Sequence, residues 1–343
     1  MKTLVKDKPQ KGIILKDVPI PEMKDNEVLI RIKSAGICGT DVHIYDWDEW
    51  SRNRIKPPLI IGHEFVGEIA ALGKLVSHVR IGQRVSAEGH ITCGRCALCR
   101  TGQAHICRDV EIIGVDRDGC FAEYMAINAG NLWPVHDGIP DSIAALFDPV
   151  GNAMHTVMAE PVAGKSLLVT GAGAIGLFAV AIARKAGASA IMVIEPNRFK
   201  RELALKVGAD MVFDPADEII DEAVDNETEG MGAHILLEMS GHPQAINRGF
   251  GLLRNGGCAC LLGIPPGEVK INWARDIIFK GITIRAINGR RMFDTWFQTQ
   301  DFLIKNQKAV KQLITHQLPF EKFQHGFDLL HEGKAVKVVL KVQ

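Results

Sequence analysis

Residues 166–176, SLLVTGAGAIG, decide how the second half of the chain folds. Strand-forming residues lead into a glycine-rich turn, and residues 177–186 after the turn favour a helix. Gly171 permits the tight turn, Gly173 lets the backbone approach a pyrophosphate, and Gly176 allows close packing of helix on strand. The amide groups at the helix N-terminus would bind phosphate oxygens. This stretch therefore predicts a dinucleotide-binding strand, turn and helix.

An acidic residue follows at the spacing that such a site requires. Glu195 lies 19 residues after Gly176, at the end of the next predicted strand, where a carboxylate accepts hydrogen bonds from ribose hydroxyls. Its charge would repel a 2′-phosphate, so the sequence favours NAD over NADP. Arg198, Lys200 and Arg201 follow closely and could partly offset that repulsion. An ordinary turn without a ligand is the alternative.

Apolar strands alternate with helical segments from about residue 164, which indicates a parallel sheet of βαβ units. Six such strands complete a doubly wound sheet. The candidate strands are 167–170, 190–194, 211–213, 235–238, 258–262 and 283–287.

The first 150 residues carry short β-rich runs, such as 27–32 and 65–69, among Gly and Pro residues, with little helical signal. After residue 290 the pattern predicts a final strand that rejoins this first domain. The chain is thus expected to be α/β, with a catalytic domain at 1–148, a nucleotide-binding domain at 149–290 and a returning segment at 291–343. In that segment we expect helices at 296–305 and 321–331 and strands at 313–318 and 336–340.

The 40 basic and 40 acidic residues give a formal net charge of zero, so nothing predicts capture by nucleic acid or an anionic membrane. Small neutral or zwitterionic ligands fit better. No stretch approaches the roughly 20 apolar residues that cross a bilayer, and no signal core follows the start. We therefore expect a cytoplasmic protein whose eight cysteines stay reduced.

Four cysteines are spaced as Cys93-x2-Cys96-x2-Cys99-x7-Cys107 within a lobe at 88–110. Four thiolates at such spacing predict a tetrahedral zinc with no open position, which is typical of a structural site. Iron–sulfur ligation is the chemical rival, but the run lacks the x3-Cys-Pro ending of bacterial ferredoxins. No CxxCH motif occurs, which excludes c-type haem.

A catalytic zinc needs a different site, with three protein ligands and one open position. Cys38, His63 and Glu64 are the candidates. Taken singly, a buried cysteine is usually a small packing group, and a histidine more often satisfies a hydrogen bond.

The order of these motifs resembles the zinc-containing medium-chain dehydrogenase family. The shared features are Cys-Gly-Thr-Asp at 38–41, Gly-His-Glu at 62–64, the cysteine lobe and the Rossmann turn. The resemblance covers essentially the whole chain and implies a GroES-like β-rich catalytic domain joined to a Rossmann doubly wound parallel sheet. Residues 147–152 lack the cysteine that supplies a third zinc ligand in alcohol dehydrogenases of the family, which moves the chain towards the polyol and threonine dehydrogenase branches. Segments 40–50, 89–94, 147–153 and 289–296 favour the threonine branch.

This resemblance implies NAD-dependent oxidation of the L-threonine 3-hydroxyl to 2-amino-3-oxobutanoate, on the way to glycine, in a homotetramer. It also implies one catalytic and one structural zinc in each subunit, held by the two groups of candidate ligands above. Thr40 and His43 would relay the proton, because a hydroxyl and an imidazole close to Cys38 can carry it to the surface. Asp148 would assist near the metal.

The remaining candidate residues bind substrate or cofactor. His90 and Asn152 are near the metal-site motifs in sequence and are candidates for the substrate ammonium and carboxylate. The resemblance places Ile175 at the pyrophosphate and Lys200 at the adenosine ribose. It places a further group at the nicotinamide: Leu262, Gly263, Ile264, Ile287 and Asn288.

Two other functions stay open. A polyol or secondary-alcohol dehydrogenase would use the same zinc and cofactor but needs no ammonium recognition. A non-catalytic protein could keep the zinc lobe for interactions and the Rossmann sheet as a redox sensor, although the Cys38, His63 and Glu64 set argues against it.

Overall fold

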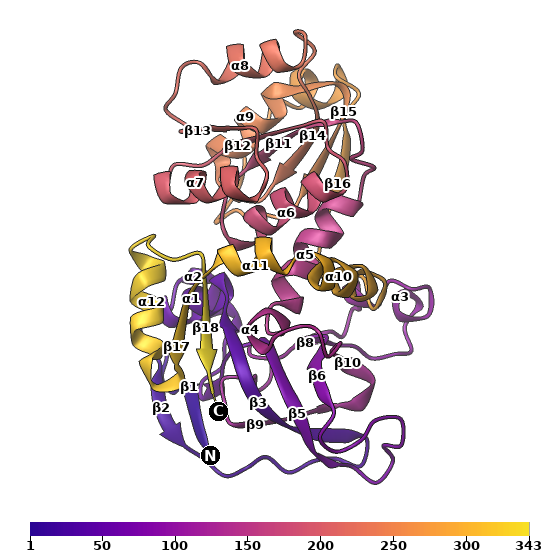
Figure 1. Cartoon of the computed structure of the whole chain (residues 1–343), viewed down its shortest axis with the longest axis vertical. Helices are drawn as coiled ribbons and strands as arrows, with labels where there is room; N and C mark the ends of the chain where they lie inside the picture. Colours follow the sequence, from indigo (N-terminus) through magenta and orange to yellow (C-terminus); the bar gives the residue numbers. More distant parts are fainter. Residues whose placement is uncertain (343) are drawn as a thin grey trace. The chain divides into compact units, whose positions relative to one another are not determined.

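The computed structural model describes residues 1–342, and the chain divides into two compact units (Figure 1). One unit comprises Met1–Pro149 together with the chain from Arg291 onwards. The other comprises Val150–Arg290. Each unit has its own cluster of buried apolar side chains. Within residues 1–342, no helix combines the length and the apolar character that crossing a bilayer requires.

The first unit is built on a seven-stranded sheet. Its centre is the antiparallel pair β3 (Glu27–Ile37) and β5 (Glu64–Leu72), in which Gly36 lies opposite Glu64. β3 also pairs with the last strand, β18 (Lys337–Lys341), so the C-terminal segment completes this sheet. The other strands of the sheet are β6 (Arg84–Ala87), β9 (Tyr124–Asn128), β10 (Leu132–Pro134) and β17 (Ile314–Pro319).

Two smaller sheets and several helices accompany this sheet. β1 (Lys2–Lys6) pairs with β2 (Ile14–Asp17) and β4 (Leu59–Ile60), and β7 (His90–Ile91) pairs with β8 (Glu111–Ile112). The helices are α1 (Gly39–Asp46), α2 (Glu49–Arg54), α3 (Ala97–Arg100), α4 (Asp141–Ala144), α10 (Asp294–Lys305), α11 (Gln307–Leu313) and α12 (Phe323–His331). Short 3-10 turns are found at Ala104–Ile106, Ala129–Asn131 and Phe320–Lys322.

Helices α1 and α2 lie in a region where the sequence showed little helical signal. Side-chain caps stabilise these two helices, and neither has a long apolar face that a sequence pattern would reveal. The Asp41 carboxylate accepts the backbone N–H of Cys38 before α1, at 2.8 Å. The Asp48 carboxylate accepts the backbone N–H of Ser51 at the start of α2, at 2.9 Å. Such caps are worth about 1 kcal/mol each.

The second unit is a six-stranded parallel sheet in the order β13-β12-β11-β14-β15-β16. The six predicted strands are confirmed, and the order is that of a doubly wound sheet. The strands are β11 (Ser166–Thr170), β12 (Ala190–Ile194), β13 (Met211–Phe213), β14 (Ala233–Glu238), β15 (Leu253–Leu261) and β16 (Thr283–Ala286). Every residue of β11 and β12 is buried, as expected for central parallel strands.

Helices connect these strands, and two glycines fix the first connection. The helices are α6 (Ala174–Lys185), α7 (Arg198–Val207), α8 (Ile220–Glu227), α9 (Pro243–Leu252) and a π-helix (Trp273–Ile278), while α5 (Phe147–Met158) crosses the boundary between the units. Gly171 has a φ of 88°, a left-handed conformation that favours glycine. A Cβ on Gly176 would lie 2.1 Å from the carbonyl oxygen of Gly171, so only glycine permits this close turn.

Candidate functional site

Strand pairing in the first unit brings three candidate metal ligands together. Cys38 follows β3 and caps α1, whereas His63 and Glu64 lie at the start of β5. Because β3 and β5 are antiparallel neighbours, the end of one strand lies beside the start of the other. One ligand atom from each of these three residues lies within 4.8 Å of the others.

Gly36 makes room for the Glu64 carboxylate. A Cβ at position 36 would lie 2.2 Å from Glu64 Oε2, far inside van der Waals contact. Any side chain there would displace the carboxylate or push the two strands apart. A glycine at this position of β3 is therefore part of the site.

Glu64 also belongs to a buried ion pair. Lys337, from β18, places Nζ 2.7 Å from Oε1 and 2.6 Å from Oε2 of Glu64, and donates a further hydrogen bond to the Ile37 carbonyl at 3.0 Å. Both side chains are almost fully buried. Burial alone would lower the pKa of Lys337, but Glu64, Cys38 and Asp41 together outweigh burial and raise that pKa. The ammonium is therefore charged and is held beside the metal group.

His63 and Asp41 complete the electrostatics of the group. Burial would lower the pKa of His63, but Cys38, with smaller contributions from Asp41 and Asp148, outweighs burial, and the pKa of His63 rises to about 10. Burial raises the pKa of Asp41 to about 6, against the opposing effect of His63. His63 Nδ1 is buried and has no hydrogen-bond partner among residues 1–342.

These features fit a zinc ion. A thiol, an imidazole and a carboxylate are the donor types that zinc prefers, and three protein ligands leave one tetrahedral position for a substrate oxygen. The unsatisfied imidazole nitrogen and the surrounding carboxylates also favour a cation at this point.

The predicted relay residues lie on the helix that Cys38 caps. Thr40 Oγ1 lies 3.9 Å from the Cys38 sulfur. Thr40 and His43 are three residues apart on α1, so they share a helix face. The His43 side chain is 62% exposed, and its Nδ1 lies 2.6 Å from Asp48 Oδ2. Asp148 is buried at the start of α5, and its carboxylate is one of the charges that raise the pKa of His63.

The two candidate substrate residues already have protein partners. His90 Nδ1 lies 2.8 Å from Glu88 Oε1, and the Trp296 indole N–H donates to the other oxygen of Glu88 at 2.8 Å. In the second unit, Asn152 Oδ1 accepts a hydrogen bond from Arg290 at 3.2 Å. These contacts orient both polar side chains.

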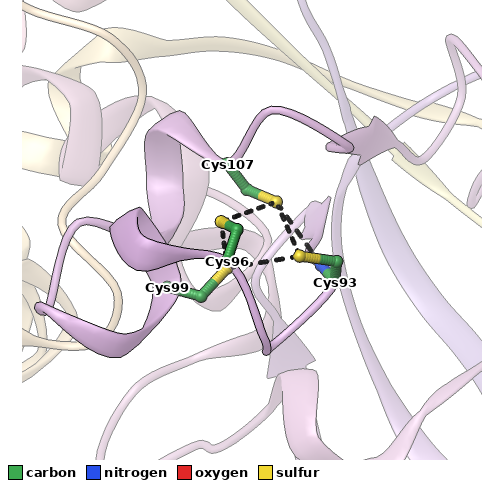
Figure 2. A group of neighbouring side chains, drawn as sticks. All are labelled: Cys93, Cys96, Cys99 and Cys107. Carbon is green, nitrogen blue, oxygen red and sulfur yellow. Dashed lines mark hydrogen bonds between the residues drawn. The ribbon is translucent and has the colours of Figure 1, made fainter.

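The four lobe cysteines form a compact group of sulfurs (Figure 2). The Sγ–Sγ distances are 3.5 Å for Cys93–Cys107 and Cys96–Cys99, and 3.9 Å for Cys93–Cys99 and Cys96–Cys107. A disulfide would require about 2.05 Å. Four thiolates around a zinc at 2.3 Å would be separated by about 3.8 Å, the edge of that tetrahedron. The backbone N–H of Cys99 lowers the pKa of Cys96 to about 6, which favours the thiolate.

A cavity of about 770 Å³ lies at the carboxyl ends of the strands in the second unit, where doubly wound sheets bind nucleotides. It is lined by Gly171, Gly173 and Glu195 of the predicted set, and also by His242, Gln244 and Arg248. Nothing lies within 4 Å of a Cβ built on Gly173, so the backbone there is open to a phosphate.

Glu195 holds the glycine-rich turn in place. Its Oε2 accepts the backbone N–H of Ala172 at 2.7 Å, and its Oε1 accepts that of Asn197 at 3.0 Å. The carboxylate therefore links the turn after β11 to the end of β12. Of the other predicted cofactor residues, Ile175 lies in the first turn of α6 and Lys200 in the first turn of α7.

The predicted nicotinamide residues follow two neighbouring strands. Leu262 and Gly263 directly follow β15, and the backbone N–H of each donates to the carbonyl of Glu238 at the end of β14, at 3.0 Å. The side chain of Ile264 is largely exposed. Ile287 donates to the Leu261 carbonyl at 2.9 Å, and Asn288 follows it at the end of β16.

Sequence reasoning missed three residues beside the metal group and the relay. Lys337 donates a hydrogen bond to the carbonyl of Ile37, three hundred positions earlier in the chain. The one sequence feature that could have indicated Lys337 is the presence of a lysine within the apolar run 335–340. Asp41 and Asp48 were visible only as acids inside quoted segments. Their roles as caps follow from helices that the sequence did not predict.

Comparison with known proteins gives matches over the whole chain. Residues 24–137 match the family described as alcohol dehydrogenase GroES-like domain, and residues 174–305 match zinc-binding dehydrogenase. The chain is 48% identical over 340 residues to the L-threonine 3-dehydrogenase of Stenotrophomonas maltophilia, covering 99% of both chains. It is 45% identical over 340 residues to that of Bacillus licheniformis, covering 99% of this chain and 98% of the relative.

The fold is also similar to solved structures. One is a short chain alcohol dehydrogenase from E. coli CFT073 complexed with NADH, with a TM-score of 0.91 at 26% identity. The similarity covers 100% of this chain and 99% of that one.

Proposed function

Since this chain belongs to the zinc-binding dehydrogenase family, together with the L-threonine 3-dehydrogenases, we propose that it oxidises L-threonine at its 3-hydroxyl with NAD. The product of this oxidation is L-2-amino-3-oxobutanoate, the first intermediate on the way to glycine. The observation that carries the proposal is the 45–48% identity to such enzymes over essentially the full chain.

The chain supplies ligands, a positioning ion pair and a route for the proton. When bound, zinc at Cys38, His63 and Glu64 supplies a Lewis acid for the alcohol oxygen, and NAD supplies the hydride acceptor. Lys337 holds the Glu64 carboxylate in place through the buried ion pair. Asp148 adds a second buried carboxylate near His63, which keeps the environment favourable to a cation.

Proton removal falls to the residues on α1. Thr40 lies beside Cys38 and is placed to accept the proton of a substrate hydroxyl. His43, on the same helix face, receives the proton and releases it to solvent, because its side chain is exposed. Because an alcohol must lose its hydroxyl proton as its carbon loses hydride, this route serves the oxidation directly.

The remaining candidate residues would bind the substrate and the cofactor. We propose that His90 and Asn152 contact the ammonium and carboxylate of threonine. In the second unit, Gly171, Gly173, Ile175 and Gly176 would cradle the pyrophosphate. Glu195 and Lys200 would bind the adenosine ribose, and the nicotinamide half would contact Leu262, Gly263, Ile264, Ile287 and Asn288.

The Glu195 carboxylate is the reason for preferring NAD. A negative charge at the end of β12 would repel the 2′-phosphate of NADP and accept ribose hydroxyls. The ratio of kcat/KM for NAD to kcat/KM for NADP measures this preference. A ratio below one would overturn the NAD assignment without affecting the zinc chemistry.

The structural zinc would occupy the lobe of Cys93, Cys96, Cys99 and Cys107, apart from the catalytic site. Because four thiolates fill its coordination, this ion supplies stability and no chemistry. We therefore expect about two zinc ions per chain.

We further propose a cytoplasmic homotetramer. The cytoplasm, where thiols stay reduced, suits a protein whose eight cysteines are free. Strand β16 is one of the two edge strands of the parallel sheet and is exposed, and Trp273 and Phe279, which precede it in the chain, are 60% and 81% exposed. An open edge flanked by apolar side chains is suited to pairing with another copy. Light scattering of the purified protein would give its mass directly.

The activity is tested by comparing initial rates of NADH formation on L-threonine, sorbitol and 2,3-butanediol. We expect L-threonine to be preferred, and preference for a polyol would replace the proposal by the second function left open above. Trapping the product as aminoacetone, which 2-amino-3-oxobutanoate forms by decarboxylation, would identify the oxidised position.

A further inference from the structure

The first turn of α2 holds His43 from three directions. Asp48 Oδ2 lies 2.6 Å from His43 Nδ1, and the Ser51 hydroxyl donates to the His43 carbonyl at 2.7 Å. The Trp50 ring lies edge-on to the imidazole, with centroids 6.3 Å apart. Trp50 and Ser51 lie in the six-residue helix α2, and Asp48 is the N-cap of that helix. The backbone, the ring plane and one ring nitrogen of His43 are all fixed by this segment.

The Asp48 carboxylate can act on His43 because its two oxygens have separate tasks. Oδ1 accepts the backbone N–H of Ser51 and caps α2, whereas Oδ2 faces the imidazole. The backbone N–H of Ser51 and the contact with His43 outweigh partial burial and lower the pKa of Asp48. An ionised carboxylate only accepts hydrogen bonds, so Nδ1 of His43 must carry a proton.

That requirement fixes the tautomer of the neutral ring. With the proton on Nδ1, the lone pair lies on Nε2, and Nε2 is the nitrogen able to accept a proton. We propose that Asp48 is a positioning residue for proton transfer, holding His43 as the Nδ1–H tautomer so that Nε2 serves as the base. This inference rests on the proposed function, because it assigns a role within that proton route.

The step balances in protons and charge. Nε2 takes the proton that leaves the substrate hydroxyl through Thr40, and the ring becomes an imidazolium beside the Asp48 carboxylate. Nε2 then releases that proton to water or buffer at the exposed surface, which restores the Nδ1–H tautomer. Asp48 neither gives up nor receives a proton in this cycle.

An Asp48→Asn substitution separates the two tasks of this side chain. Its amide oxygen can still cap α2 by accepting the Ser51 N–H, since asparagine is a good N-cap. The amide NH2 then faces Nδ1 and donates to it, which places the ring proton on Nε2. The variant keeps its helix and loses its base. Asp48→Ser likewise preserves a cap but has no carboxylate for the ring.

The kinetic test measures NADH formation from L-threonine in a single turnover of the zinc-loaded enzyme. We expect Asp48→Asn and Asp48→Ser to slow this rate about tenfold, which is less than the roughly 10²–10⁴-fold contribution of general base catalysis because the pair is exposed. The KM for NAD, measured separately from steady-state rates, should not change. Asp46→Asn is the matched control, because the Asp46 carboxylate pairs with Lys11 and His331, whereas the His43 ring pairs with Asp48.

A spectroscopic measurement distinguishes positioning from a merely structural role. The 15N shifts of His43, identified by their loss in His43→Ala, report which ring nitrogen carries the proton at a pH where the ring is neutral. We expect Nδ1–H in wild type and Nε2–H in Asp48→Asn. Wild-type rates in both Asp48 variants, or an Nε2–H tautomer in wild type, would overturn the inference. If wild type formed no NADH from threonine while the tautomer shift occurred, the proposed function alone would fail.

Discussion

The buried pair of Lys337 and Glu64 makes the stability of this protein depend on one lysine. The ammonium lies 2.6–2.7 Å from the two carboxylate oxygens, and the two side chains are 2% and 0% exposed. Lys337→Met removes the charge but keeps most of the apolar stem. The Glu64 carboxylate would then be buried without its cation and close to Asp41, a second buried carboxylate.

Breaking a buried pair from one side leaves an uncompensated charge and costs about 3–5 kcal/mol. Removing both charges, in Lys337→Met/Glu64→Leu, should cost clearly less, because buried pairs replaced by apolar groups are often close to neutral. Lys33→Met is the matched control. Lys33 of β3 pairs with Glu68 of β5 in the same sheet, but these side chains are 30% and 21% exposed, so we expect a loss below about 1 kcal/mol.

Denaturant unfolding of the metal-free proteins at one fixed protein concentration measures these differences, since an oligomer's stability depends on concentration. The double variant closes a mutant cycle and gives the coupling between the two charges. A Lys337→Met loss no larger than that of Lys33→Met would refute the reasoning that this pair is desolvated and essential to the sheet.

Four further outcomes are expected. Burial lowers the pKa of Lys6 from 10.5 to about 8, so between these pH values the unfolded chain binds more protons than the folded protein. The stability of wild type should therefore rise relative to that of Lys6→Met as the pH increases from about 8 to 10.5, and denaturation at several pH values measures this difference. Gly36→Ala should lower the free energy of unfolding by about 1–3 kcal/mol and reduce the zinc content, because the added Cβ displaces Glu64. Gly39→Ala is the control: nothing lies within 4 Å of its Cβ, so unfolding and metal assays should give the wild-type stability and zinc content. Gly173→Ala should melt like wild type yet bind NAD at least about tenfold more weakly by calorimetry, because its Cβ fills space left for the pyrophosphate. Cys96→Ser should lose one zinc and expose the 88–110 lobe to trypsin, and an unaltered digestion pattern would count against a structural metal there.

The Rossmann half of the fold was predictable because its signals are local. Each parallel strand is a short buried apolar run, and the glycine turn carries its own conformational requirements. The βαβ pattern predicted a doubly wound parallel sheet. The short helices α1 and α2 were not predictable in this way, since they depend on caps by Asp41 and Asp48 that only the folded loop brings into place.

The metal group was predictable in its ligands and not in its surroundings. Cys38, His63 and Glu64 stand in recognisable motifs, and strand pairing brings them together. Lys337 reaches Glu64 only because β18 returns to pair with β3, a contact between distant parts of the chain. The sequence predicted that this last strand rejoins the first domain, but not the register that places Lys337 beside Glu64.

The central claim, that one zinc at Cys38 is needed to oxidise threonine, is tested most directly by measuring zinc content and threonine-dependent NADH formation on the same samples. Cys258→Ser, a buried cysteine of β15 outside both metal groups, serves as the control for Cys38→Ser. We expect about two zinc ions per chain in wild type and in the control, and about one in Cys38→Ser, with at least a hundredfold loss of rate in that variant. Full zinc content and full activity in Cys38→Ser would contradict the claim.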